Sequence, residues 1–181
     1  MVKLGAALPL EQRPRATCAL CLVQQGASWW AHVGDSRIYH LRGGALVGRS
    51  RDHSHVEVLL REGLITAEQA QTHPHRNFVE CCLGGDPILP DMAIARRRPL
   101  QSGDVLLVCT DGFWSGLKDP EIAAELSGTS SAGSPGGASG SPGETSGSPG
   151  GTSGVPLREK LLELSQRAVT RTGTASDNTS E

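Results

Sequence analysis

Gly103-Asp-Val-Leu-Leu-Val-Cys-Thr-Asp-Gly-Phe-Trp114 is the stretch on which the interpretation of the whole chain depends. Its apolar run, residues 105–109, is short and bounded by Gly- and Asp-containing turns, which predicts a buried strand rather than a helix. Asp111 then lies at the mouth of the core, where the loss of water is costly unless a cation or hydrogen bonds replace it. From this stretch alone, an ordinary turn cap is the favoured role and a metal ligand is the alternative.

Two other acidic turns favour the metal-ligand role of Asp111. Asp35 lies within Val33-Gly-Asp-Ser-Arg37, and Asp177 within Ser176-Asp-Asn178. Each of the three aspartates is flanked by Gly or Ser at a strand end or turn. They could therefore converge on one hard cation, which prefers oxygen ligands.

Four segments, taken in order, resemble the motifs of a known family. They are Ala31-His-Val-Gly-Asp-Ser-Arg-Ile-Tyr39, Arg51-Asp-His-Ser54, Leu106-Leu-Val-Cys-Thr-Asp-Gly-Phe-Trp114 and Asp177-Asn178. Together they are similar to the PPM-type (protein phosphatase type 2C-like) metal-dependent serine/threonine phosphatases. The resemblance implies an α+β fold, an antiparallel β-sandwich flanked by helices, with two Mn²⁺ or Mg²⁺ ions at one end and hydrolysis of phosphoserine or phosphothreonine by metal-activated water.

The resemblance also implies roles for individual residues. Asp111 and Asp177 match the catalytic aspartates that hold the second metal, and Asp35 matches the ligand of an additional metal. Around them, Asn178, Gly112, Asp52 and His53 are expected to position the ligands or their loops. His53 is expected to act through hydrogen bonds, because a lone histidine before a helix is usually structural.

The resemblance does not cover the whole family domain. No Asp-Gly-x-Gly-Gly turn, which bridges both metals in the family, precedes Thr17, and no strand follows Asn178. The expectation is a bacterial PPM-type fold truncated at both ends, with weak or no activity. Three alternatives remain: a working phosphatase with Glu11 or Asp52 as substitute ligand, a pseudophosphatase that binds phosphorylated partners, and a fragment without function.

Composition divides the chain into four parts. Residues 1–15 are a tail, residues 16–126 the first part of the phosphatase domain, and residues 155–181 its last helix with the Asp-Asn motif. Between them, residues 127–154 consist almost entirely of Gly, Ser, Thr and Pro and close with three similar heptapeptides. Such a tract has nothing to bury and is expected to be a disordered insertion.

Local patterns predict the elements of the domain. Strands are expected at residues 16–24, 29–33, 37–41 and 45–48 as an antiparallel meander, a further element at 78–83 and an edge strand at 91–97. Helices are expected between Ser54 and Gly63, from a capping box at Thr66, from Asp119 through Leu126 and from Pro156 to Gly173. The last helix should bury one apolar face, formed by Leu157, Leu161, Leu164 and Ala168.

Composition restricts the partners. The net charge is −2 and aromatic residues make up 3% of the 181-residue chain, which favours neither nucleic acid nor a membrane. The expected partners are phosphoserine and phosphothreonine proteins, such as kinase substrates, met by a monomer. No signal peptide or membrane span is expected.

Reduced thiols at the five cysteines indicate a cytoplasmic protein, and their spacing makes a zinc site with His73 and His75 the less favoured interpretation.

Overall fold

The computed structural model describes residues 7–84, 90–127 and 156–173. The predicted insertion at residues 127–154, apart from its first residue, and the Asp177-Asn178 motif lie outside the described residues. The elements, in chain order, are η1 (Leu10–Gln12), β1 (Arg15–Ala16), β2 (Cys18–Gln24), β3 (Ala27–Val33), β4 (Arg37–Arg42), β5 (Ala45–Arg49), α2 (His55–Arg61), α3 (Ala67–Gln71), β6 (Leu83–Gly84), β7 (Ala93–Pro99), β8 (Val105–Cys109), α4 (Asp111–Trp114), α5 (Asp119–Ser127) and α6 (Leu157–Thr172).

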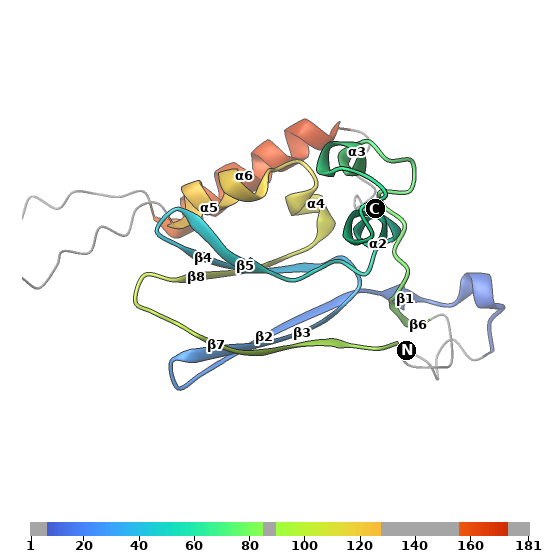
Figure 1. The fold of residues 1–181 in the computed structure, drawn as a ribbon, viewed down its shortest axis with the longest axis horizontal. Coiled ribbons are helices and arrows are strands. Elements are labelled where there is room, and N and C mark those ends of the chain that lie inside the picture. The colour runs from blue at the N-terminus through green and yellow to red at the C-terminus, as the bar shows by residue number, and fades with distance from the viewer. Residues whose placement is uncertain (1–6, 85–89, 128–155, 174–181) are drawn as a thin grey trace, which may run out of the picture.

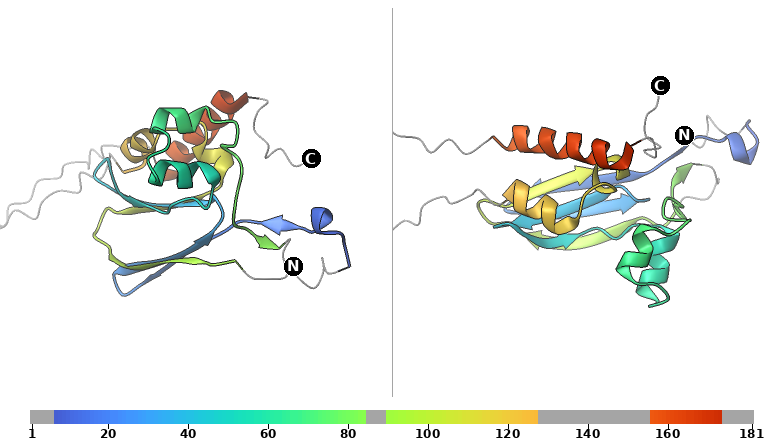
Figure 2. Two further views of the ribbon diagram at one scale, coloured as in Figure 1. Left: turned by 45° about the vertical axis from the view of Figure 1, so that its right-hand side comes forward. Right: turned by 90° about the horizontal axis from the view of Figure 1, so that it is seen from above.

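Two antiparallel three-stranded sheets face each other and form the sandwich that the sequence predicts (Figure 1). One sheet has the order β2-β3-β7 and the other β5-β4-β8, and a short β1-β6 pair lies at one end. Helices α4, α5 and α6 cover the outer face of the β5-β4-β8 sheet, with α5 and α6 side by side (Figure 2). None of the helices in the described ranges has the length and apolarity needed to cross a bilayer.

The main apolar core lies between the β5-β4-β8 sheet and the helices. Alternate residues of β4 and β8 point to this side, because directly paired residues of neighbouring strands share a face. The helices contribute Ile122 and Leu164, both almost fully buried. The buried members of this cluster are Tyr39, Leu41, Leu107, Leu117, Ile122, Ala123, Leu126, Leu164 and Ala168.

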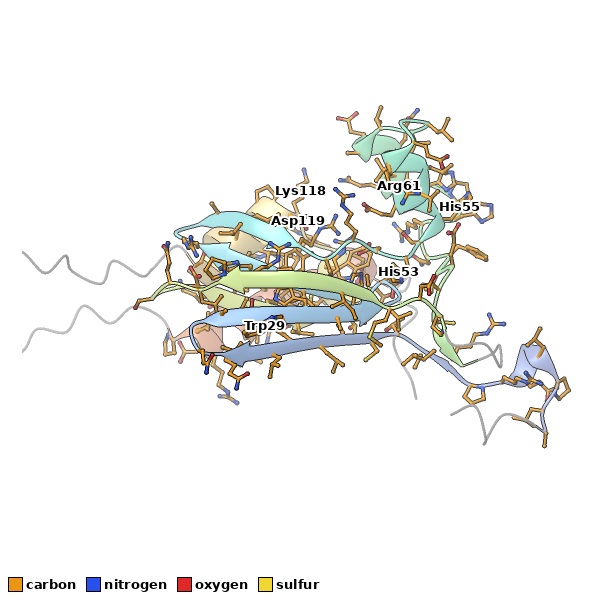
Figure 3. The ribbon with its side chains drawn as sticks, turned by 60° about the horizontal axis from the view of Figure 1, so that its bottom comes forward. Trp29, His53, His55, Arg61, Lys118 and Asp119 are labelled. Atoms are coloured by element: carbon orange, nitrogen blue, oxygen red, sulfur yellow. The ribbon has the colours of Figure 1, made fainter. Side chains whose placement is uncertain are left out.

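The outer face of the β2-β3-β7 sheet is covered by none of the described helices (Figure 3). The strand register places Leu20 opposite Ala31, Leu22 opposite Trp29, and Ile94 opposite Ala31, so these five side chains share that face. Leu20, Leu22 and Ile94 are 56%, 59% and 76% exposed, respectively. We call this surface the bare sheet face.

The helix predictions are confirmed where local signals set the ends. Ser54 caps α2 by accepting a hydrogen bond from the Glu57 N–H, and Thr66 and Gln69 form the predicted capping box of α3. The glycines that were expected to end two helices, Gly63 and Gly173, both adopt positive φ, which glycine tolerates without a steric penalty.

The predicted meander is wrong, because β3 and β4 do not pair. The chain crosses from one sheet to the other at residues 34–36, and the two hairpins on either side belong to different sheets. The predicted element at 78–83 is likewise reduced to an isolated bridge between Ser54 and Val79 and the two-residue strand β6.

Two predicted burial patterns also differ from the structure. Strand β8 lies at a sheet edge, so Val108 is 47% exposed and only Leu107 of the run is buried. Helix α6 is rotated relative to the expected face and buries Lys160, Leu164 and Ala168, while Leu157 and Leu161 are exposed.

Candidate active site

Three turns meet at the end of the sandwich where β3, β5 and β8 end: residues 34–36, residues 50–54 and the junction of β8 with α4 (Figure 1). The first turn carries Asp35 and is shaped by Gly34, which has φ 97°. A Cβ atom at position 34 would press against the side chain of Thr17. Thr17 and Ser36 share a hydrogen bond of 2.8 Å between their hydroxyls, which joins the turn to the start of β2.

The second turn docks onto the first through its backbone. The His53 N–H donates to the Gly34 carbonyl at 2.9 Å, and the Gly34 N–H donates to His53 Nδ1 at 3.4 Å. The ring of His53, which is labelled in Figure 3, lies with its centroid 4.8 Å from that of His32 at a tilt of 35°. His32 Nε2 in turn bonds the Arg51 carbonyl at 2.6 Å. Burial, followed by the neighbouring His32, lowers the pKa of His53, so the neutral ring is favoured. These bonds hold the loop at residues 50–54 against the first turn, and the positioning role of His53 stays a prediction.

Asp111 is the first residue of α4. Thr110 takes the N-cap position without a side-chain cap, and Asp111 Oδ1 accepts a hydrogen bond of 2.8 Å from the Gly112 N–H. This bond reaches only the next residue, whereas an Asx turn bonds the backbone two residues on, so the turn-capping role stays a prediction. Carboxylate oxygens of this kind are also the ligands that a hard divalent cation prefers.

Asp35 and Asp111 approach closely enough to interact electrostatically. Burial is the largest cause, and the negative charge of Asp111 the next, of a rise in the pKa of Asp35 from 3.8 to about 6. Asp52 contributes in the same direction, and Arg37 opposes it. The turns thus gather negative charge at a partly buried position, an arrangement that a bound cation would stabilise.

Arg37 connects the Asp35 turn to the loop that carries Asp52 and to Tyr39 of β4. Its guanidinium donates to both carboxylate oxygens of buried Asp52, from Nε at 2.9 Å and from Nη2 at 2.7 Å. Burial alone would lower the pKa of Arg37, but the contacts with Asp52 and Tyr39 together outweigh burial and the pKa is raised. Tyr39 continues the network by donating to Asp119 at 3.0 Å, and Arg49 pairs with Asp119 at 3.2 Å.

The donor set at this end suits a hard divalent cation. Asp35 and Asp111 offer carboxylate oxygens, and Mg²⁺ is commonly held by one or two carboxylates while it keeps several waters. Within the described residues, no group of three or more His, Cys, Asp or Glu side chains is arranged to hold a metal. Among the described residues, Asp35 and Asp111 would be the ones to hold such a cation.

The sequence-predicted residues divide into three groups. Asp35, Asp111, Gly112 and His53 lie in the three turns as described above. Asp52 is in the same place, but its carboxylate is occupied by Arg37, which argues against its use as a substitute ligand. The predicted roles of Asp177 and Asn178, and of the side chain of Glu11, fall outside the described residues and stay predictions.

Arg37 and Trp114 are two residues of the site to which the sequence patterns assign no role. The Trp114 indole N–H donates to the Asp35 main-chain carbonyl at 3.0 Å, and its ring lies 3.4 Å from Arg37 Cζ. The one signal in the sequence was the presence of both residues inside the quoted motifs. Their mutual contact joins positions 37 and 114, and no local pattern reveals such a pairing.

Comparisons with known proteins find serine/threonine phosphatases of bacteria. The chain is 39% identical over 94 residues to the protein phosphatase PhpP of Streptococcus pneumoniae, covering 51% of this chain and 37% of PhpP. Its fold matches the S. agalactiae serine/threonine phosphatase with a TM-score of 0.70 and 26% identity, over 95% of this chain and 60% of that one. The catalytic domain of the phosphatase PstP, solved with two manganese ions, matches with a TM-score of 0.56 and 24% identity, over 85% of this chain and 53% of that one. No family model matches the chain.

The chain spans less than half the length of the curated relatives it matches. The matched part of the S. agalactiae enzyme accounts for nearly all of this chain, so the two share the sandwich and its flanking helices.

Proposed function

We propose that this chain, which is related to the bacterial PPM-type serine/threonine phosphatases over part of their length, is a metal-dependent phosphoprotein phosphatase domain. The observation that carries the proposal is the meeting of the Asp35 and Asp111 turns, linked by the hydrogen bond from the Trp114 indole to the Asp35 main-chain carbonyl, at the end of a sandwich that the solved phosphatases share. Its substrates are phosphoserine and phosphothreonine proteins, including the products of protein kinases. The two-manganese structure of PstP supports Mn²⁺ or Mg²⁺ as cofactor.

The residues of the chain have separate tasks in this proposal. Asp35 and Asp111 hold the cation, and Asp177, with Asn178 beside it, contributes from the C-terminal motif. Arg37 and Asp52 hold the turn of Asp35, while neutral His53 holds the loop at residues 50–54 against Gly34. When bound, such an ion lowers the pKa of a coordinated water and neutralises charge on the phosphoryl oxygens.

Two further properties belong to this proposal. All five cysteines are free thiols, which supports a cytoplasmic setting. A monomer is the simplest assembly, since the carboxylate pair is formed within one chain.

The alternative is a phosphoprotein-binding module without turnover. It is favoured by the absence, among the described residues, of a group of three or more ligands arranged for a metal. Such a module would retain the fold and bind phosphorylated segments, and the hydrolysis step would be missing.

Hydrolysis of a phosphothreonine peptide with Mn²⁺ tests the proposal. We expect turnover by the wild-type protein, loss of turnover in Asp111→Ala, and normal turnover in the matched control Asp91→Ala, which removes an exposed carboxylate. Peptide binding without turnover would favour the binding module. A folded protein that neither binds nor hydrolyses the peptide would contradict both.

A further inference from the structure

Trp114 is the residue that physically joins the two candidate ligand turns. It lies at the end of α4, the helix that begins at Asp111, and it donates its indole N–H to the main-chain carbonyl of Asp35 at 3.0 Å. The face of the same indole lies 3.4 Å from the Cζ atom of Arg37. One side chain therefore contacts both the turn that carries Asp35 and the first residue of β4.

The turn depends on contacts other than a sheet ladder. Residues 34–36 cross between the two sheets, so no sheet ladder runs through them. The hydrogen bonds of Thr17 with Ser36 and of His53 with Gly34 hold the turn from the side of β2 and of the loop at residues 50–54. The Trp114 indole holds it from the helix that begins at Asp111.

Arg37 makes the restraint stiff. Asp52 holds the edge of the guanidinium through two short hydrogen bonds, and Trp114 covers its face. This stacking of a cation on an aromatic ring is worth most when both groups are shielded from water, as the partly buried Arg37 and Trp114 are. Asp52, Arg37 and Trp114 thus form a continuous chain of contacts. It connects the loop at residues 50–54, the start of β4 and α4.

We propose that Trp114 is a positioning residue that sets the separation of the Asp35 and Asp111 carboxylates. The proposal rests on the proposed metal-dependent function, in which these two side chains hold the cation. The indole N–H is the essential group, because a phenylalanine ring would still stack on Arg37 but would leave the Asp35 carbonyl without this donor.

The chain contains a matched control in Trp30. Its indole N–H donates to Ser28 Oγ at 3.1 Å, and its ring lies 4.3 Å from Arg98 Cζ. Trp30 thus makes the same two kinds of contact within the β2-β3-β7 sheet rather than with the Asp35 turn, and it is almost fully buried.

The test compares Trp114→Phe with Trp30→Phe in the full chain. Hydrogen exchange of the amides at residues 34–37 and the Mn²⁺ dissociation constant from calorimetry are both measured. For Trp114→Phe we expect exchange at these amides to become about five-fold faster and Mn²⁺ binding about five-fold weaker, the effect of losing one neutral hydrogen bond. Trp30→Phe should leave both unchanged, even though it lowers the global stability at least as much.

Three outcomes decide the matter. Equal changes in both variants, or no change in Trp114→Phe, would overturn the positioning role. A selective change in Trp114→Phe supports it, and a larger change in Trp114→Leu, which also removes the stacking on Arg37, would strengthen it. If the wild-type protein binds no Mn²⁺, the proposed function fails, and the exchange at residues 34–37 alone decides whether Trp114 restrains the turn.

Discussion

The two sheets of the sandwich have the same number of strands but opposite surroundings. The β5-β4-β8 sheet has helices over its outer face, and its residues Tyr39, Leu41 and Leu107 belong to the main apolar core. The bare sheet face of β2-β3-β7 instead leaves Leu20, Leu22 and Ile94 more than half exposed. The contribution of an apolar strand residue to stability therefore depends on which elements cover it in the fold, and not on its hydrophobicity alone.

The largest expected effect compares one leucine from each side. Leu164→Ala should lower the free energy of unfolding by about 3 kcal/mol, because it leaves a cavity in the core under α6. Leu22→Ala on the bare sheet face should cost less than about 0.5 kcal/mol. Urea denaturation measures both values. Equal costs would show that the bare sheet face is covered in solution.

The next effect concerns the crossover that connects the sheets. Gly34→Ala should destabilise the protein by about 2 kcal/mol, because residue 34 has φ 97° and its Cβ would press against Thr17. Gly26→Ala is the control: Gly26 also has positive φ, at 67°, but open space around it, so about 1 kcal/mol is expected. Thermal melts of the two variants would refute the steric argument if the midpoints coincided.

The titration of Asp35 should make the free energy of unfolding depend on pH. Its pKa of about 6 in the folded state lies above its usual value of 3.8, so the protonated form favours folding and stability is lost as the pH rises from about 4 to above 6. In metal-free buffer, Asp35→Asn should stabilise the protein by about 1–2 kcal/mol at pH 7.5 and have little effect at pH 4.

Denaturation across this pH range measures how steeply the free energy of unfolding changes with pH. The control Asp91→Asn, at an exposed position, should keep the wild-type dependence. A wild-type slope that persists in Asp35→Asn would assign the titration to another group.

The smallest effect tests exposure on the bare sheet face itself. Leu22→Ser should change stability by less than about 0.5 kcal/mol but should reduce the fluorescence of a bound hydrophobic dye, because it interrupts a contiguous apolar surface. Leu64→Ser, at an exposed leucine in the loop after α2, serves as the control and should leave dye binding unchanged. Equal dye binding by both variants would contradict the exposure of a contiguous apolar surface on the bare sheet face.

The sequence predicted the parts of the fold that local signals determine. The strand at 105–109, the helix after Ser54, the capping box at Thr66 and the helix stop at Gly173 all depend on neighbours a few residues apart. The assignment of β3 and β4 to different sheets could not be read, because Gly34-Asp35-Ser36 looks the same in a hairpin as in a crossover. The rotation of α6 was missed because it depends on α4 and α5, with which it packs.

The candidate site shows the same division. The motifs indicated Asp35 and Asp111, and the structure brings both to one end of the sandwich. The contact of Trp114 with Asp35 and Arg37 joins positions almost eighty residues apart, and the periodicity of either segment carries no trace of it. Side-chain partners over such separations follow from topology, which the sequence patterns left open.

The docking of α6 has a consequence for how the molecule assembles. This helix follows residues 128–155 in the chain and packs on α4 and α5, where Leu164 completes the main core. Its docking is therefore an association whose strength depends on the effective concentration that the covalent connection provides. A break in the backbone between residues 127 and 156 would turn it into a bimolecular reaction. The core under α6 would then be completed by a second polypeptide, to an extent that depends on the concentrations of the two.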